Sequence, residues 1–259
     1  MDYGIKYDYH THTVFSHGKG SIEDNVRAAV QKGLCGIAIS DHGPGHLLYG
    51  VERDKIKNMR GEIERLRGVY QNIDIYLAVE ANIMDAGNCL DVGKSETGSY
   101  DFIIAGYHYG VRGGFCVRNF ICCHSPVHLP GRDRLKSQNT EMAVRAIYEN
   151  PIKILTHPGD KGPFDITEIA KACAERGTWM EINSGHKHLT VEGIREAAKT
   201  DVKFVICSDA HTPERVGSCE NGIKRALDAG LDMERIVNIA DCNCNRALGR
   251  GKNTGDNLS

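Results

Sequence analysis

Residues 7–18 read YDYHTHTVFSHG, and this stretch decides the fold. Residues 7–11 have the extended pattern of a buried strand, which leads into His10 and His12. Side chains two residues apart project from the same face of a strand, so these two imidazoles point together. His17 follows in the loop beyond. One strand that ends in histidines is weak evidence for a metal site. The evidence becomes stronger if other strands end in the same way.

The same unit recurs along the chain, because an apolar extended run is repeatedly followed by a helical pattern. Seven runs qualify as strands, at residues 7–11, 36–40, 73–80, 102–107, 153–156, 178–182 and 203–207. Helices are expected at residues 22–32, 55–67, 141–148, 166–176, 191–199 and 214–229. This alternation predicts a parallel sheet with helices outside it, either open or closed into a barrel. No GxGxxG or Walker sequence follows the first strand, which argues against a nucleotide-binding fold.

Metal-ligand side chains follow nearly every predicted strand. Beyond the first strand they are Asp41, His42, Glu80, His108, His157, His186, Asp209 and His211. The carboxyl ends of barrel strands converge on one face, where such side chains come within reach of one centre. Imidazole and carboxylate donors without thiolate suit zinc, manganese or iron, and the lack of cysteine argues against a structural zinc site. The recurrence therefore predicts a metal centre at this edge of the sheet.

Two aspartates are candidates for supporting roles. Asp8 lies on the same strand face as His10, one layer deeper, and is a candidate acceptor that orients a ligating imidazole. Asp41 is the corresponding candidate beside His42. The alternative for each is a capping or polar core residue, and the sequence leaves both interpretations open.

The composition argues against several classes of protein. With 259 residues, one large α/β domain is favoured over two small ones. The formal charge of −2 gives no basic field for nucleic acid, no apolar run approaches the roughly 20 residues of a membrane helix, and residues 1–6 lack an export signal. We therefore expect a cytoplasmic protein that binds neither a membrane nor nucleic acid. The ten cysteines are expected to be free thiols, including the pair in Cys242-Asn243-Cys244.

Seven segments carry a resemblance to a known family. They read HTHTVFSHG, AISDHGP, AVEANI, IIAGYH, LTHPGD, EINSG and CSDAHT, in this order, and the likeness extends from about Tyr7 to about Leu248. The chain resembles the PHP (polymerase and histidinol phosphatase) phosphoesterases and is most similar to their YcdX-like phosphatase branch. The resemblance implies a single PHP domain over residues 1–259, folded as a distorted (β/α)7 TIM-like barrel with a metal cluster at the carboxyl ends of the strands.

The resemblance also implies about three divalent metal ions, with zinc as the first expectation and manganese or iron as alternatives. The first ion would be bound by His10, His12, Glu80 and Asp209. The second would be bound by Glu80, which bridges, His108 and His157, and the third by His17, His42 and His211. All nine positions hold the expected residue type.

A cluster of this kind predicts a metal-dependent phosphatase for small phosphomonoesters. Clustered cations lower the pKa of bound water towards roughly 7 and neutralise the phosphoryl oxygens, so that an activated hydroxide attacks phosphorus directly. We assign the catalytic role to Glu80, Asp209 and His211. Candidate phosphate contacts near the strand ends are Asn183, Lys187 and Arg215. The alternative for Lys187 and Arg215 is that each is an exposed charge that does not contact the substrate.

Two loops depart from the family pattern. The loop from His12 to His17 is one residue shorter than in relatives, and residues 109–138 form a longer segment. Because this segment follows a strand at the site-bearing edge, we expect a basic lid whose cations contact an anionic substrate, namely Arg112, Arg118 and Arg132. The alternative is a solvated surface loop. A less favoured interpretation is an extra metal site formed by residues of this segment, namely Cys116, Cys122, Cys123, His124 and His128.

Other functions remain open. A 3′–5′ exonuclease or phosphodiesterase and a histidinol phosphatase belong to the same family, and the first would require a basic groove with interleaved aromatic residues. A non-catalytic metal-binding module would show lost ligands, and none of the nine is lost. An amidohydrolase-type barrel would use a bridging lysine after a middle strand, whereas Tyr107 and His108 end the fourth strand here. The natural substrate and the oligomeric state are left open.

Overall fold

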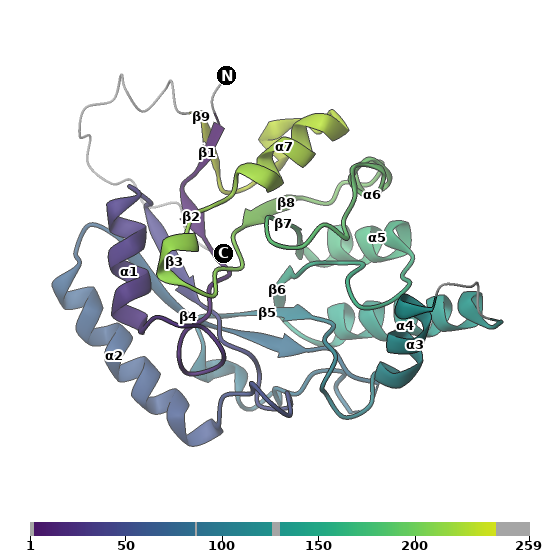
Figure 1. Ribbon diagram of the computed structural model, residues 1–259, viewed down its shortest axis with the longest axis horizontal. Helices are drawn as coiled ribbons and strands as arrows, with labels where there is room; N and C mark the ends of the chain where they lie inside the picture. The colour runs from purple at the N-terminus through teal and green to yellow at the C-terminus, as the bar shows by residue number, and fades with distance from the viewer. Residues whose placement is uncertain (1–2, 86, 126–129, 242–259) are drawn as a thin grey trace.

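The computed structural model describes residues 3–85, 87–125 and 130–241 (Figure 1). Seven parallel strands form one sheet, and their order in the sheet follows their order in the chain. They are β2 (Tyr7–Asp8), β3 (Gly36–Ile39), β4 (Asp74–Asn82), β5 (Phe102–Gly106), β6 (Ile152–Leu155), β7 (Trp179–Asn183) and β8 (Phe204–Cys207). A parallel bridge between Thr11 and Ala210, with a 2.8 Å hydrogen bond from His12 N to Ala210 O, brings the two ends of the sheet together. The predicted seven-stranded, nearly closed barrel is thereby confirmed.

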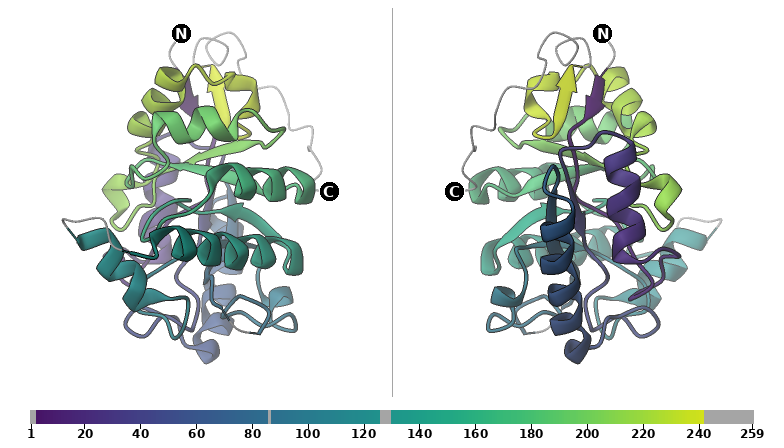
Figure 2. Two further views of the ribbon diagram at one scale, coloured as in Figure 1. Left: turned by 90° about the vertical axis from the view of Figure 1, so that its right-hand side faces the viewer. Right: turned by 90° about the vertical axis from the view of Figure 1, so that its left-hand side faces the viewer.

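Helices alternate with the strands and lie outside the barrel. They are α1 (Ile22–Gln31), α2 (Ile56–Val69), α3 (Cys116–His124), α4 (Arg132–Glu149), α5 (Ile166–Arg176), α6 (Val191–Ala197) and α7 (Glu220–Ala229). Figure 2 shows the teal and green helices α4 and α5 on one side of the sheet, and the purple and blue helices α1 and α2 on the opposite side. Short 3₁₀ turns occur at η1 (Arg53–Lys55), η2 (Thr97–Ser99), η3 (Pro213–Arg215) and η4 (Met233–Arg235).

The start of α1 fixes where the His17 loop ends. Ser21 Oγ accepts a 3.1 Å hydrogen bond from Asp24 N, and the Asp24 carboxylate accepts a 3.0 Å bond from Ser21 N. Each side chain thus satisfies an N–H group that the first helical turn leaves unpaired. This reciprocal cap ends the loop that begins after β2 and gives the loop a defined anchor.

The two faces of the barrel strands have different neighbours. Val79 of β4 belongs to the large outer core between the strands and the helices. A smaller inner core is formed by Ile104, Ile154, Val205 and Cys207. Glu80 lies beside Ile104 in the sheet register, and Glu181 lies beside Val205. Because neighbouring residues in register share a face, both carboxylates point into the barrel.

A small antiparallel pair, β1 (Tyr3–Ile5) and β9 (Ile239–Asp241), joins the two ends of the described chain. The sequence pattern does not predict this pair, because three residues are too few to show a strand period. Within the described ranges, no helix has both the length and the apolar character needed to cross a membrane. The cysteines of these ranges are free, and Cys242 and Cys244 lie outside them.

Two predicted elements differ from the structure. Residues 109–138, expected to be a long loop, contain α3 and the first turns of α4, which begins at Arg132 and not near residue 141. The helical pattern of α3 is obscured because its apolar residues Val117, Phe120 and Ile121 are exposed. At the other end of the chain, α7 begins at Glu220 and not at residue 214, since η3 is followed by Gly217 with φ of +73°.

Candidate metal centre

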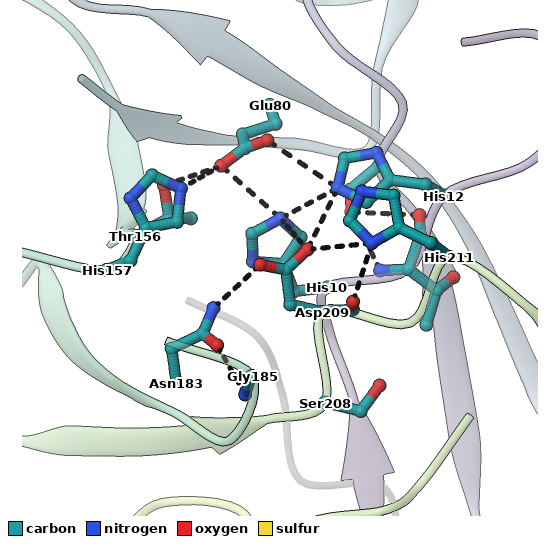
Figure 3. Close-up of polar contacts among 12 residues, drawn as sticks. His10, His12, Glu80, Thr156, His157, Asn183, Gly185, Ser208, Asp209 and His211 are labelled. Carbon is teal, nitrogen blue, oxygen red and sulfur yellow. Dashed lines mark hydrogen bonds and ion pairs between the residues drawn. The ribbon is translucent and has the colours of Figure 1, made fainter. Parts of the chain in front are cut away.

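The carboxyl ends of the strands surround a cavity of about 360 Å³. Seven of the nine predicted metal ligands line it: His17, His42, Glu80, His108, His157, Asp209 and His211. The other two, His10 and His12, are completely buried. Figure 3 shows His10 and His12 beside Glu80 and Asp209, so the four side chains lie together despite their separation in sequence.

Glu80, on the inner face of β4, lies at the centre of the site. Its side chain is buried, and its Oε1 atom accepts a 2.8 Å hydrogen bond from Thr156 Oγ1. The same oxygen lies 2.8 Å from His157 Nε2, 3.2 Å from His108 Nε2 and 3.3 Å from His10 Nε2. One carboxylate oxygen therefore faces nitrogens that come from three different strand ends.

The second oxygen of Glu80 faces another group of histidines. Glu80 Oε2 lies 2.9 Å from His42 Nδ1 and 3.6 Å from His12 Nε2. Among the described residues, neither Glu80 Oε2 nor His42 Nδ1 has a hydrogen-bond partner, so their close approach is not a hydrogen bond. His12, His42, His17 and His211 each offer a nitrogen within 4.8 Å of the other three. This group is the predicted third ligand set with His12 added.

His10, His12 and Asp209 form a third group of donor atoms. His10 Nε2 lies 3.1 Å from His12 Nε2, and Asp209 Oδ1 lies 3.5 Å and 3.2 Å from these two nitrogens, respectively. Figure 3 shows both rings turned toward the Asp209 carboxylate. With Glu80 Oε1 at 3.3 Å from His10 Nε2, these are the four residues of the predicted first ligand set.

The spacing of the donor atoms fits divalent cations. Two atoms bound to one zinc ion at about 2.0–2.2 Å in tetrahedral geometry lie roughly 3–3.6 Å from each other. The 3.1 Å between His10 Nε2 and His12 Nε2 and the 3.2 Å between His108 Nε2 and His157 Nε2 agree with this separation. The buried Nδ1 atom of His17 also lacks a hydrogen-bond partner in the part of the chain that the structure describes. The residues therefore fit a cluster of cations bound by nitrogen and oxygen.

Burial and charge set the protonation of the ligand side chains. Burial lowers the pKa of His12 well below its ordinary value, that of His17 to about 4 and that of His108 to about 3. Burial opposes ionisation of Glu80, but His108 and His10 outweigh it, so the pKa of Glu80 falls well below its usual range. At neutral pH the three rings keep a lone pair and Glu80 keeps its charge, as metal ligands require.

Local backbone geometry is unusual at the site. His157 and Asp209 have φ of +29° and +53°, a region that residues other than glycine rarely adopt. At Gly106, the end of β5, an added Cβ would lie 2.2 Å from Thr156 Oγ1 and 3.2 Å from Glu80 Oε1. Only glycine lets this strand pass so close to Glu80 and its neighbours.

Two residues that the sequence analysis did not select orient the predicted ligands. Glu181 Oε1 accepts a 2.8 Å hydrogen bond from His10 Nδ1, and Glu181 Oε2 accepts a 2.6 Å bond from His157 N. Asn82 Oδ1 lies 2.8 Å from His108 Nδ1. Glu181 lies in the EINSG segment and Asn82 lies in the AVEANI segment. The period-two pattern places Glu181 on the inner face of its strand. That signal could have identified Glu181.

The two aspartates predicted to orient imidazoles have other partners. Asp8 accepts hydrogen bonds from Ser208 Oγ at 2.5 Å and from Gly217 N at 2.7 Å, and it contacts His10 only at the backbone nitrogen. The expected contact between Asp8 and an imidazole is therefore wrong. The Asp8 carboxylate instead binds Ser208 and Gly217, which lie before and after the segment that carries Asp209 and His211. Asp41 likewise supports a loop.

Asp41 ties down the loop that carries His17. It accepts hydrogen bonds from Thr13 N at 2.7 Å, Thr13 Oγ1 at 2.6 Å and Ser16 Oγ at 2.5 Å. The adjacent ring of His42 receives no hydrogen bond from it, so the predicted His42 contact is also wrong. Both residues follow the end of β3, where His42 forms a parallel bridge with Glu80, and adjacent residues of such extended backbone point to opposite faces.

The predicted substrate contacts do not line the cavity: Asn183, Lys187, Arg215, Arg112, Arg118 and Arg132. Asn183 uses both ends of its amide within the protein, because Nδ2 donates to Glu181 and Asp209 and Oδ1 accepts from Gly185 N and His186 N. The five cations are exposed. Within the described ranges, the cation that does line the cavity beside the predicted ligands is Lys161, together with His186.

Comparisons with known proteins agree with this architecture. The family model of the PHP domain matches residues 8–185. A probable phosphatase from Thermoanaerobacter sp. (strain X514) is 30% identical over 246 residues, which cover 89% of this chain and 89% of that protein. A probable phosphatase from Shewanella sp. (strain MR-4) is 31% identical over 253 residues, which cover 92% of this chain and 88% of that protein.

A solved structure shares the fold. Histidinol phosphate phosphatase from Lactococcus lactis subsp. lactis Il1403, crystallised with zinc, L-histidinol and phosphate, matches with a TM-score of 0.61. The match covers 88% of this chain and 94% of that chain at 15% sequence identity. At this identity the comparison concerns the fold and the course of the chain.

Proposed function

The chain belongs to the PHP domain family, and on this premise we propose that it hydrolyses small phosphomonoesters at a cluster of about three divalent cations. It is a phosphoesterase, as its curated relatives are probable phosphatases over nearly their whole length. The observation that carries the proposal is the position of Glu80, whose buried carboxylate lies within 3.6 Å of five imidazoles.

The two oxygens of Glu80 support a bridging role. Oε1 faces His10, His108 and His157, whereas Oε2 faces His12 and His42. In this proposal Glu80 would hold a first ion together with His10, His12 and Asp209, and a second ion together with His108 and His157. A third ion would be held by His17, His42 and His211, and we assign the catalytic role to Glu80, Asp209 and His211.

The bound cations would supply an activated water nucleophile and neutralise the charge of the phosphoryl oxygens. The protein's own residues hold the ligands in place, since Glu181 fixes the His10 ring and Asn82 lies against the His108 ring. The donor set of nitrogen and oxygen suits zinc, manganese or iron, and the zinc in the Lactococcus lactis structure supports zinc first. A cavity of about 360 Å³ favours a small substrate.

We also propose that the chain forms one PHP domain in which residues 109–138 cover the candidate metal centre. Tyr109 and Gly110, at the start of residues 109–138, line the cavity. Leu47 N donates a 2.8 Å hydrogen bond to Gly110 O, which links this segment to the loop after β3. The segment therefore forms part of the cavity wall from its first residues.

The test compares wild type with Glu80→Gln, a change that preserves shape and removes the bridging charge. Metal-loaded wild type should hydrolyse p-nitrophenyl phosphate and lose activity with a chelator, and Glu80→Gln should lose metal and at least about 100-fold in kcat. Glu141→Gln, an exposed residue of α4, is the matched control. Full metal and full activity in Glu80→Gln would contradict the bridged cluster.

The substrate panel separates the proposal from its alternatives. Bis-p-nitrophenyl phosphate, single-stranded DNA and histidinol phosphate should be turned over less efficiently than simple phosphomonoesters. Preference for either diester would favour a phosphodiesterase or exonuclease, and preference for histidinol phosphate would favour that biosynthetic activity. Metal-replete protein that is inactive on every substrate would favour a non-catalytic metal-binding module.

A further inference from the structure

A second group of polar side chains lies beside the predicted ligands and belongs to none of the three predicted ligand sets. Its centre is Asp160, in the loop after β6, which is 2% exposed. The Asp160 carboxylate lies 2.5 Å from Lys161 Nζ, 3.0 Å from His186 Nδ1 and 2.9 Å from His188 Nδ1. One buried acid therefore anchors three basic side chains that come from the loops after β6 and β7.

Part of this group faces the candidate site. Asp160, Lys161 and His186 line the same cavity as Glu80 and Asp209, whereas the half-exposed His188 does not. His186 Nε2 lies 3.3 Å from Asp209 Oδ2, so the group is in contact with the predicted ligands. The cavity thus has a wall with a fixed cation next to the metal centre.

The backbone at Lys161 is held in an unusual conformation. Its φ is +61°, which a residue with a side chain adopts only at a cost in free energy. Gly159, two residues earlier, has φ of +89°. Asp160 Oδ1 also accepts a 2.8 Å hydrogen bond from Lys161 N. The carboxylate thus fixes both the backbone and the ammonium group of Lys161. Strain of this kind is common at functional sites, where it aims a side chain.

The group could in principle hold a fourth metal ion, because Asp160, His186 and His188 offer donor atoms within 4.8 Å of one another. The position of Lys161 argues against this use. Its ammonium group already neutralises Asp160 at 2.5 Å, so a divalent ion would have to displace it. A cation that is aimed into a cavity and fixed by a buried acid is instead suited to an anionic ligand.

We propose that Lys161 contacts an oxyanion of the phosphorylated substrate, and that Asp160 is the positioning residue that holds Lys161 over the cavity. An ammonium group has three N–H donors, and Asp160 is the partner found for it among the described residues. Donors therefore remain for a phosphoryl or carboxylate oxygen. The proposal rests on the proposed function, because it assumes that the cavity binds a phosphate ester.

The test measures kinetics and metal content of Lys161→Met, Lys161→Arg and Asp160→Asn. We expect Lys161→Met to raise KM for p-nitrophenyl phosphate and Ki for inorganic phosphate by about tenfold, with a smaller fall in kcat and unchanged metal content. Lys161→Arg should recover most of the affinity, and Asp160→Asn should raise KM. Lys171→Met is the matched control, since Lys171 pairs with Glu168 on the outer helix α5.

A second ester distinguishes which oxyanion is bound. If Lys161→Met raises KM only for a phosphomonoester that also carries a carboxylate, Lys161 contacts the second anionic group, and the proposal holds for that group. Unchanged KM for both esters, with unchanged phosphate affinity, would overturn it. Loss of one metal ion in both Asp160→Asn and His188→Gln, but not in Lys161→Met, would overturn it in favour of a fourth metal site.

The Lys161 contact can be tested even if the protein shows no phosphatase activity. If the wild type shows no turnover, calorimetry of inorganic phosphate binding to the metal-loaded protein still compares wild type with Lys161→Met. Weaker binding in the variant supports the contact, and equal or absent binding in both overturns it. Circular dichroism confirms that each variant is folded.

Discussion

At the scale of single residues, Glu181 holds two of the predicted metal ligands, His10 and His157, from the inner face of β7. It is completely buried and accepts hydrogen bonds from His10 Nδ1, His157 N and Asn183 Nδ2. The bond to Nδ1 leaves Nε2 of His10 free to face Glu80 and Asp209. Such partners fix the tautomer and orientation of a ligating histidine.

Replacing Glu181 by Gln should therefore weaken metal binding. The amide of glutamine brings a donor to a place where three donors already point, so at least one of the three contacts is lost. We expect a rise of roughly 10- to 100-fold in the metal dissociation constant, measured by competition with a chelating dye. Glu141→Gln is again the control, and equal metal affinity in Glu181→Gln and wild type would refute this role.

His17 gives a prediction about pH. Burial lowers its pKa from 6.5 to about 4, so between these values the unfolded chain binds a proton that the folded chain does not. The contribution of His17 to stability is therefore lost as the pH falls from 6.5 toward 4. In metal-free protein, His17→Gln should lose less unfolding free energy than wild type over this range.

Denaturant unfolding at several pH values measures this difference. The loss of the stacking contact between His17 and Tyr49, whose ring centroids are 4.4 Å apart, lowers the stability of the variant at every pH but leaves the pH slope unaffected. His124→Gln, at an exposed residue of α3, is the matched control. Parallel pH profiles for wild type and His17→Gln would contradict the prediction.

At the scale of elements, the loop after β2 depends on a residue that follows β3. Asp41 accepts three hydrogen bonds from Thr13 and Ser16, and the loop then presents His17 to His42 and His211. The loop has no regular structure of its own between β2 and the capped start of α1. Asp41 thus anchors Thr13 and Ser16 from outside the loop, in addition to backbone hydrogen bonds such as that from Gly18 N to Thr13 O.

Asp41→Ala should release the loop and affect one ion more than the others. Donors left without a partner destabilise the fold by roughly 1–3 kcal/mol, and His17 loses its fixed position. We expect the variant to hold about one metal ion fewer than wild type while Glu80 and its neighbours keep theirs. Elemental analysis with thermal unfolding measures both effects. Retention of every ion, or loss of all of them, would show that the loop does not serve a separate site.

At the scale of the whole molecule, the barrel gathers side chains that are distant in sequence. His10 and Asp209 are 199 positions apart in the chain, yet their donor atoms are 3.5 Å apart because Thr11 and Ala210 bridge the two ends of the sheet. The inner core below Glu80 supports the strands from within. The metal centre is thus a property of the closed barrel and of no single segment.

This also explains what the sequence could and could not predict. The seven strands and the metal-ligand side chains at their ends follow from repeated local patterns, which fit an open sheet as well as a barrel. The closed barrel and the placement of His10, Glu80 and Asp209 at one ion came from the resemblance to the PHP family. The partners of Asp8 and Asp41 depend on how loops pack, and the expected imidazole contacts were wrong for that reason. Arg112, Arg118 and Arg132 do not line the cavity, because their positions depend on the paths of the loop after β5 and of α3 and α4, and their substrate contacts stay predictions.

The most direct test of the metal centre is elemental analysis of the purified, metal-loaded protein after removal of free metal. The nine predicted ligand residues, with Glu80 at their centre, should retain about three ions per chain, and Glu80→Gln should retain clearly fewer. Fewer than about one ion per chain in the metal-loaded wild type would contradict a shared cluster at the mouth of the barrel.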